Sequence, residues 1–229
     1  MNYIPALRYE SLTRFYDPVL RATLKEDRFK RLLVEQAALR PGHRVLDVGC
    51  GTATLTILLK QACAEAEVTG LDGDAKVLDL ARTKIQAAGL DVVLMQGLAS
   101  EAPFPLASFD RIVSSLVFHH LATEEKRRTL KRIRELLKPG GEVHIADWGK
   151  AQSPAMRVAF LAIQLLDGFA TTADNVRGLL PMLMADAGFR AVEETHREST
   201  IFGTLSLYRG VAPKRHCARA PVTIETGAA

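Results

Sequence analysis

The chain has 229 residues, of which 48% are hydrophobic and 24% charged, a balance typical of one globular domain with a sizeable core. Its net charge of +4 is a mild excess that does not by itself imply a nucleic-acid or lipid partner. Three cysteines without a Cys-x-x-Cys pair argue against a disulfide framework and a zinc site, so the sequence predicts no bound metal.

The chain shows no targeting or membrane signal. Its first residues lack the apolar core of a signal peptide, and no apolar run approaches the about 18 residues that cross a bilayer. We therefore expect a cytoplasmic protein without integral membrane association.

The N-terminal segment, to about Leu39, is expected to form one or two helices. Apolar residues recur there close to helical spacing, at Phe29, Leu32, Leu33 and Ala37. The turn sequence RPGH then ends the segment.

From residue 44 to residue 148, strand-like and helix-like segments alternate. The predicted strands are 44–48, 67–72, 91–97, 109–116 and 142–148. The predicted helices are 52–63, 74–89 and the strongly charged 124–141, which Pro and Gly should close. Apolar strands alternating with helices are typical of an α/β fold whose parallel sheet is covered on both faces.

The pattern changes after residue 148. Residues 149–178 predict a mostly helical insertion, and a further helix should end at Gly188. Two strand-like segments, 191–199 and 200–210, follow with almost nothing between them and should pair as a hairpin. The expected organisation is therefore a single domain over 1–211, with a disordered tail at 212–229.

A carboxylate and a glycine turn lie between the first predicted strand and its helix, in VLDVGCGTA at 45–53. Ligands of open parallel sheets bind at such carboxyl ends, where Gly49 and Gly51 let a ligand approach the backbone. Dinucleotides use G-x-G-x-x-G, but the sixth position here is Thr54. S-adenosylmethionine is the other ligand class that uses this turn.

Asp72 ends the second predicted strand, about 20 residues beyond the glycine turn, where an acid can accept both hydroxyls of a ribose. This acid suits either ligand class. Asp72 could instead cap the next helix, but Asp74 fits that role better.

Four motifs in order carry a family resemblance: VLDVGCGTA, VTGLDGD, FPLASFDRIVSSLVFHHL and LLKPGGEVHIADW. With them the chain resembles class I S-adenosylmethionine-dependent methyltransferases, most of all the small-molecule branch that includes the ubiquinone and menaquinone biosynthesis methyltransferases. The resemblance covers roughly residues 16–209. It implies a Rossmann-like, seven-stranded, mostly parallel sheet with helices on both faces and an antiparallel last strand. It also implies an N-terminal helical lid over 1–40 and a substrate cap at 149–178, after strand 5.

The resemblance also implies a cofactor site. Gly49 and Gly51 would pack against the methionine part, with Asp47 supporting the loop, and Asp72 would bind the ribose. The ring of Tyr16 would suit the sulfonium cation. Leu98 stands where an acid often meets the adenine, so adenine recognition would rely on backbone groups or apolar packing. The full cofactor-binding set is Tyr16, Asp47, Gly49, Cys50, Gly51, Asp72, Gly73, Leu98, Ala99 and Ser115.

The implied reaction is in-line displacement at the sulfonium methyl of S-adenosyl-L-methionine, which leaves S-adenosyl-L-homocysteine. Alignment supplies much of the rate, and a general base helps when the acceptor carries a proton. Candidate catalytic residues at the carboxyl edge of the sheet are His119, His120 and Asp147, with Asp167 in the insertion. His119 and His120 could instead form a surface turn or be satisfied by neighbours, and Asp147 could simply close the fifth strand.

The methyl acceptor is expected to be a small, hydrophobic molecule. The segment after the fourth strand, SSLVFHHL, lacks the Asn/Asp-Pro-Pro-aromatic run typical of nucleobase amine methylation, and no Pro-Cys occurs. We expect no nucleic-acid partner. An RNA or protein methyltransferase, a non-catalytic cofactor-binding protein and a dinucleotide-dependent reductase are the alternatives. The apolar segment 159–166 is a packed lid or the face of a homodimer.

Overall fold

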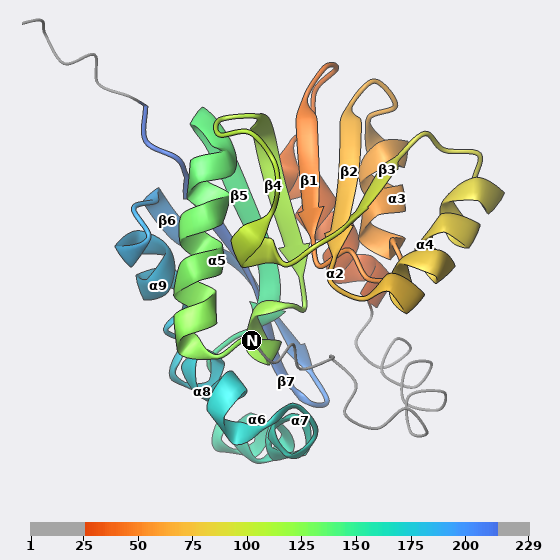
Figure 1. Ribbon diagram of the computed structural model, residues 1–229. Coiled ribbons are helices and arrows are strands. Elements are labelled where there is room, and N and C mark those ends of the chain that lie inside the picture. Colours follow the sequence, from red (N-terminus) through yellow and green to blue (C-terminus); the bar gives the residue numbers. More distant parts are fainter. Residues whose placement is uncertain (1–25, 215–229) are drawn as a thin grey trace, which may run out of the picture.

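The structure is a computed structural model, and it describes residues 26–214 (Figure 1). Its centre is a seven-stranded sheet in the order β3-β2-β1-β4-β5-β7-β6. The strands are β1 (Arg44–Val48), β2 (Glu67–Asp72), β3 (Val93–Gln96), β4 (Phe109–Ser115), β5 (Leu137–Trp148), β6 (Arg190–Thr200) and β7 (Gly203–Val211).

Strands β1 to β5 pair in parallel, and β7 runs antiparallel to both of its neighbours, β5 and β6. The predicted α/β fold with an antiparallel last strand and a closing hairpin is therefore confirmed. β1 buries its side chains on both faces after Arg44, as the apolar run RVLDV predicts for a strand between two layers of helices.

Two helical layers cover the sheet (Figure 1). One core lies under α5 (Thr123–Leu136) and α9 (Leu180–Asp186), and the other under α2 (Glu26–Ala37) and α3 (Thr54–Ala62). Helix α4 (Ala75–Ala87) packs beside α3 through Ala81 and Ile85. Asp74 caps α4 by accepting hydrogen bonds from two backbone N–H groups, as expected.

The charged helix α5 is amphipathic. It buries Leu130, Ile133 and Leu136 against the sheet, and its charged face accounts for the KRRTLKRIRE sequence. The prediction that this helix reaches Pro139 and Gly140 was wrong. It ends at Leu136, because the next residue is already extended and Leu137 pairs with Phe109 of β4.

The insertion after β5 forms three short helices, α6 (Pro154–Ala159), α7 (Leu161–Asp167) and α8 (Phe169–Arg177), which we call the cap. The cap lies beyond the carboxyl ends of the parallel strands (Figure 1). Trp148 at the end of β5 packs against Phe160 and Ile163 of this segment, which fixes the cap to the sheet. Within residues 26–214 no helix is long and apolar enough to cross a membrane.

Candidate active site

The centre of the site is the turn after β1, at residues 49–51, which we call the glycine loop. It lies where β1 and β4 adjoin and the strand order reverses, the usual ligand position in open α/β sheets. Gly49 and Gly51 have φ angles of 70° and 54°, which glycine adopts without strain. A Cβ at Gly49 would lie 2.3 Å from Val117, whereas a Cβ at Gly51 would meet nothing within 4 Å. The space that a ligand can use is therefore above Gly51.

Asp72 holds the glycine loop in place. Its Oδ2 accepts a hydrogen bond from the N–H of Gly51 at 2.8 Å, and its Oδ1 accepts one from the N–H of Asp74 at 3.0 Å. The side chain is half-buried at the end of β2, so both oxygens keep lone pairs for a further donor. A ribose could take those positions.

Asp47 is fully buried on β1 beneath the loop. Its Oδ2 accepts a hydrogen bond from Thr56 at 2.7 Å, but its Oδ1 has no partner in the described part of the chain. Burial raises the pKa of Asp47 to about 6, although the bond to Thr56 and the charge of Lys30 act in the opposite direction. An unpaired buried carboxylate oxygen is costly unless a ligand donates to it.

Ser115 ends β4, the strand beside β1. Its Oγ is also buried without a hydrogen-bond partner among the described residues. Two orphaned polar atoms thus lie on neighbouring strands at the glycine loop. This chemistry fits the amino and carboxylate groups of a methionine moiety.

The expected adenine and ribose contacts lie at the ends of β2 and β3. Leu98 is exposed and Ala99 half-buried, at the start of the short helix η1 (Ala99–Glu101). Gly73 accepts a hydrogen bond from Gln96. The apolar Leu98 side chain is free to cover a flat ring.

Two residues of the expected cofactor-binding set, Tyr16 and Cys50, have no side-chain contact with the cofactor that the structure supports. Tyr16 lies outside the described residues. The Cys50 thiol is buried against Gly70, and burial raises the pKa of that thiol far above its usual range. Cys50 is therefore a packing residue within the loop and not a nucleophile.

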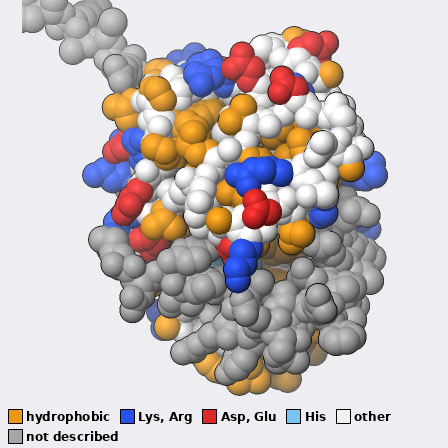
Figure 2. Space-filling model, turned by 45° about the vertical axis from the view of Figure 1, so that its right-hand side comes forward, with side chains coloured by type: hydrophobic (Ala, Val, Ile, Leu, Met, Phe, Trp, Pro, Cys, Tyr) orange, Lys and Arg blue, Asp and Glu red, His pale blue; other side chains and the backbone are white. Residues whose placement is uncertain are grey.

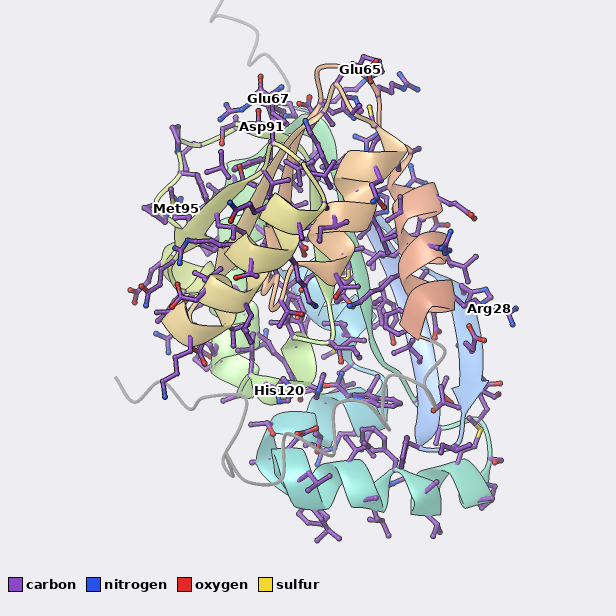
Figure 3. The ribbon with its side chains drawn as sticks, turned by 90° about the vertical axis from the view of Figure 1, so that its right-hand side faces the viewer. Arg28, Glu65, Glu67, Asp91, Met95 and His120 are labelled. Carbon is purple, nitrogen blue, oxygen red and sulfur yellow. The ribbon has the colours of Figure 1, made fainter. Side chains whose placement is uncertain are left out.

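A second polar group lies beyond β4, in the short helix η2 (Phe118–His120). Leu116 precedes it with a φ of 58°, an uncommon left-handed conformation for leucine that turns the chain sharply towards the cap. Figure 3 shows His120 between the sheet and the cap, at the opposite end of the molecule from Glu65, Glu67 and Asp91. The sheet therefore presents both polar groups of the site at its carboxyl edge.

Asp147 anchors His119. The Nδ1 of His119 lies 2.8 Å from Oδ1 of Asp147, which is fully buried at the end of β5. Asp147 also accepts hydrogen bonds from the N–H groups of Phe118 and Trp148 and from Nδ2 of Asn175 in α8. Burial acts to raise the pKa of Asp147, but His119, the N–H of Trp148 and His120 outweigh it and lower the pKa.

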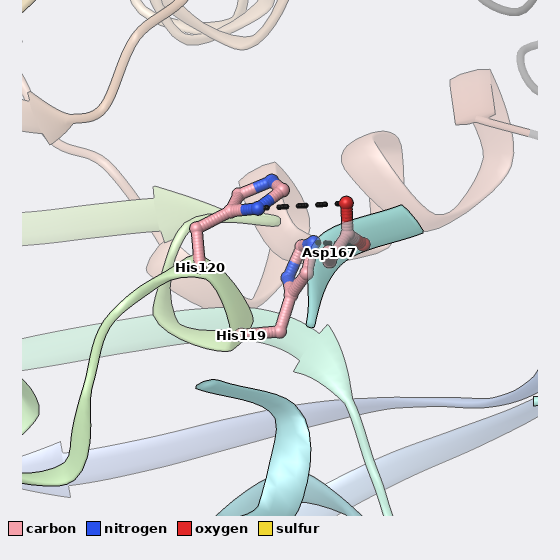
Figure 4. Close-up of side chains that lie close together, drawn as sticks. All are labelled: His119, His120 and Asp167. Carbon is pink, nitrogen blue, oxygen red and sulfur yellow. Dashed lines mark ion pairs between the residues drawn. The ribbon is translucent and has the colours of Figure 1, made fainter. Parts of the chain in front are cut away.

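Asp167, at the end of α7, faces both histidines (Figure 4). Its oxygens lie 3.6 Å from Nε2 of His119 and 3.7 Å from Nδ1 of His120. Burial acts to lower the pKa of His119, but Asp147 and Asp167 outweigh it and raise that pKa. For His120, burial and the neighbouring His119 both lower the pKa. His119 is buried and His120 is partly open, so the pair lines the wall of the site.

A buried ion pair ties the cap to α5. Lys126 Nζ lies 3.0 Å from Asp174 and also contacts Asn175 and the carbonyl of Thr171. Asn175 in turn donates to the carbonyl of Trp148 at 2.8 Å. Lys126 and Asn175 were not predicted from the sequence. The only signal for Asn175 was the polar stretch TTADN in a mostly apolar insertion, and Lys126 lay unmarked in a highly charged helix.

Comparisons with known proteins agree with this geometry. Residues 45–141 match the model of a methyltransferase domain. An uncharacterised methyltransferase of Synechocystis is 34% identical over 122 residues, which cover 53% of this chain and 55% of that protein. The chain thus spans about half the length of this relative. The ubiquinone/menaquinone biosynthesis C-methyltransferase UbiE of Shewanella oneidensis is 29% identical over 203 residues, 80% of this chain and 79% of that protein.

Solved structures show the same fold. A SAM-dependent methyltransferase from Aquifex aeolicus matches with a TM-score of 0.61 at 20% identity, over 80% of this chain and 89% of that one. A putative O-methyltransferase from Nostoc punctiforme matches with a TM-score of 0.70 at 17% identity, over 92% and 63%. These matches show that residues 45–141 carry a methyltransferase domain, that the chain is similar to UbiE over most of its length, and that it has the fold of the solved S-adenosylmethionine-dependent methyltransferases.

Proposed function

We propose that the protein transfers the methyl group of S-adenosyl-L-methionine to a small, hydrophobic molecule bound between the carboxyl edge of the sheet and the cap. The observation that carries this proposal is the adjacency of the two polar groups. The glycine loop follows β1 and the histidines follow β4, and these strands are neighbours. A methyl donor at the first would therefore lie beside an acceptor at the second.

The donor end of the site is assigned from the polar atoms that have no hydrogen-bond partner among the described residues or keep free lone pairs. The methionine part lies over Gly49, Cys50 and Gly51, where its polar groups meet Asp47 and Ser115. Asp72 binds the ribose, as its free lone pairs support. Leu98 and Ala99, with Gly73, flank the adenine. Tyr16 lies outside the described residues, so its place in an N-terminal lid stays a prediction; residues 26–37 of the expected lid are α2, which packs on the sheet.

The acceptor end is assigned to the histidines. His119 and His120 hold the acceptor atom, and Asp147 acts through His119 as a positioning residue, because its oxygens are occupied by four described donors. A bond forms between the acceptor and the methyl carbon while the carbon–sulfur bond breaks. S-adenosyl-L-homocysteine and the acceptor proton are released. Holding the three reacting atoms in line supplies the rate.

The apolar composition of the cap supports a hydrophobic acceptor. Trp148, Phe160 and Ile163 form a buried core between β5 and the cap, with Leu116 and Val176 packed against it, so the segment beside the site is built mainly on apolar packing. UbiE, by its name, methylates carbon in ubiquinone and menaquinone biosynthesis. On the coloured part of the face shown in Figure 2, acidic and basic side chains are interspersed and form no single basic stripe for a nucleic acid.

Calorimetric titration tests the donor site first. The full chain should bind S-adenosyl-L-methionine and S-adenosyl-L-homocysteine but not NADH, and Asp72→Ala should weaken both at least tenfold. Asp79→Ala, an exposed acid of α4, is the matched control and should bind as the wild type does. A wild type that binds neither ligand would refute the proposal. Transfer of labelled methyl from the cofactor to a panel of phenols, quinols and amines then identifies the acceptor class.

A further inference from the structure

Three metal-binding side chains converge at the acceptor end of the site, although they come from two distant segments of the chain. His119 and His120 belong to η2, and Asp167 ends α7 (Figure 4). One ligand atom from each, two imidazole nitrogens and a carboxylate oxygen, lies within 4.8 Å of the others. We call this group the histidine cluster.

The contacts of Asp167 are close to the spacing of ligands around an ion. Its Oδ2 lies 3.6 Å from Nε2 of His119 and its Oδ1 lies 3.7 Å from Nδ1 of His120, and both distances are longer than a hydrogen bond. Bonds of about 2.0–2.2 Å to a tetrahedral ion place neighbouring ligands about 3.3–3.6 Å apart. The side chain of His120 is 29% exposed, so it has room to rotate and close the widest separation.

The surroundings of His119 are those of a metal ligand. Histidines that bind metal through one ring nitrogen almost always donate the other N–H to a carboxylate or carbonyl, which fixes the tautomer. Nδ1 of His119 faces the fully buried Asp147 at 2.8 Å, and this leaves Nε2 directed at the cluster. Asp147 itself is held by two backbone N–H groups and by Asn175, so the orientation is rigid.

The charge of this region also favours a cation. Asp147 and Asp167 bring two carboxylates to one poorly solvated place, and the buried Lys126 of α5 is paired with Asp174. A proton on His119 balances one of the two charges, whereas a divalent ion balances both.

We propose that His119, His120 and Asp167 bind a divalent first-row transition ion, with Zn²⁺ as the best match to two imidazoles and one carboxylate. Three protein ligands leave a fourth position open, as in catalytic zinc sites. This inference rests on the proposed function, because it places the methyl acceptor at that open position. The acceptor is then a group that binds zinc as an anion, a hydroxyl of a phenol or enol.

The ion changes how the acceptor is activated. A hydroxyl that binds the ion releases its proton to solvent, because the charge of the ion lowers the pKa of a bound oxygen. The oxygen anion then attacks the methyl carbon, and the electron pair of the carbon–sulfur bond stays on sulfur. The methyl ether has no charge, binds the ion weakly and leaves. The sum is acceptor and S-adenosyl-L-methionine in, and methylated acceptor, S-adenosyl-L-homocysteine and one proton out.

Metal titration of the tag-free full chain tests the proposal. After treatment with a chelator and dialysis, Zn²⁺ is titrated in competition with a chromophoric chelator, and Co²⁺ is added to a second sample to record its visible absorption. The wild type should bind one Zn²⁺ with micromolar affinity or tighter, and Co²⁺ should give the intense bands of a four-coordinate site. Asp167→Asn and His120→Ala should each lose at least tenfold in affinity. Asp147→Asn should lose about 10–100-fold through the orientation of His119.

Two control variants lie outside the histidine cluster. Asp186→Asn removes an exposed acid of α9, and His196→Ala removes an exposed histidine of β6, so both should bind the ion as the wild type does. Equal Zn²⁺ affinity in wild type, Asp167→Asn and His120→Ala would overturn the metal site. Calorimetry with S-adenosyl-L-methionine on the same samples separates the two ideas, because binding of the cofactor without binding of Zn²⁺ refutes the metal site and leaves the proposed function standing.

Discussion

The glycine loop and the histidine cluster are built in different ways. The loop is a contiguous stretch between β1 and α3, held by backbone N–H groups that bond to the Leu71 carbonyl and to Asp72. The cluster comes from η2 and α7, and side chains of β5 and α8 help to hold it in place. The difference shows that the donor half of the site is fixed by local backbone geometry, whereas the acceptor half depends on the docking of the cap.

Removal of the Asp147 carboxylate should have the largest effect on stability. Asp147→Ala leaves His119, Asn175 and two backbone N–H groups without their acceptor in a buried place. Loss of one partner from such a group costs about 3–5 kcal/mol, so urea unfolding should show a shift of that size. A loss below about 1 kcal/mol would mean that the side chains of the acceptor half do not hold the cap.

The two glycines of the loop should differ from each other. Gly49→Ala combines a left-handed φ with a Cβ 2.3 Å from Val117, and should cost about 2–4 kcal/mol in urea unfolding. Gly51→Ala carries only the backbone strain, about 1 kcal/mol. Its Cβ enters the open space above the loop, so it should weaken cofactor binding in calorimetry despite its milder effect on folding. Equal losses of unfolding free energy in the two variants would show that the Val117 side chain moves aside for the new Cβ.

Lys126→Met should separate the halves functionally. It breaks the buried pair with Asp174 that ties the cap to α5, and leaves the glycine loop untouched. We expect the KM for the acceptor to rise several-fold while the Kd for S-adenosyl-L-methionine stays within twofold. Arg127→Met, which breaks an exposed pair with Asp186 on the same helix, is the control. A parallel loss of cofactor affinity would contradict the division into two halves.

Cofactor binding should also depend on pH. Burial raises the pKa of Asp47 to about 6, so the carboxyl is charged above that pH and neutral below it. A cationic ligand favours the charged form, and affinity should therefore fall as pH drops through 6, by up to about tenfold per pH unit. The isosteric Asp47→Asn variant should bind more weakly at pH 7.5 and lose this dependence between pH 5 and 7.5. An unchanged pH profile would remove Asp47 from the cofactor site.

The donor half of the site could be predicted from the sequence better than the acceptor half, because its contacts are local in the chain. The fold, the glycine loop and the Asp74 cap follow from signals within a few residues of each other. The contact of Asp147 with His119 joins the ends of two strands that are distant in sequence, its contact with Asn175 requires the docked cap, and no local pattern specifies either. The end of α5 was wrong because pairing of Leu137 with Phe109 overrides the helical pattern and the Pro-Gly stop.

The turn after β4 contacts both halves of the site. Val117 rests on Gly49, and three residues later the same turn presents His120 to the cap. A ligand that contacts the glycine loop and shifts Val117 therefore also moves the turn that carries His119 and His120. Binding of the cofactor and of the acceptor should therefore be thermodynamically linked, each changing the affinity for the other by the same factor.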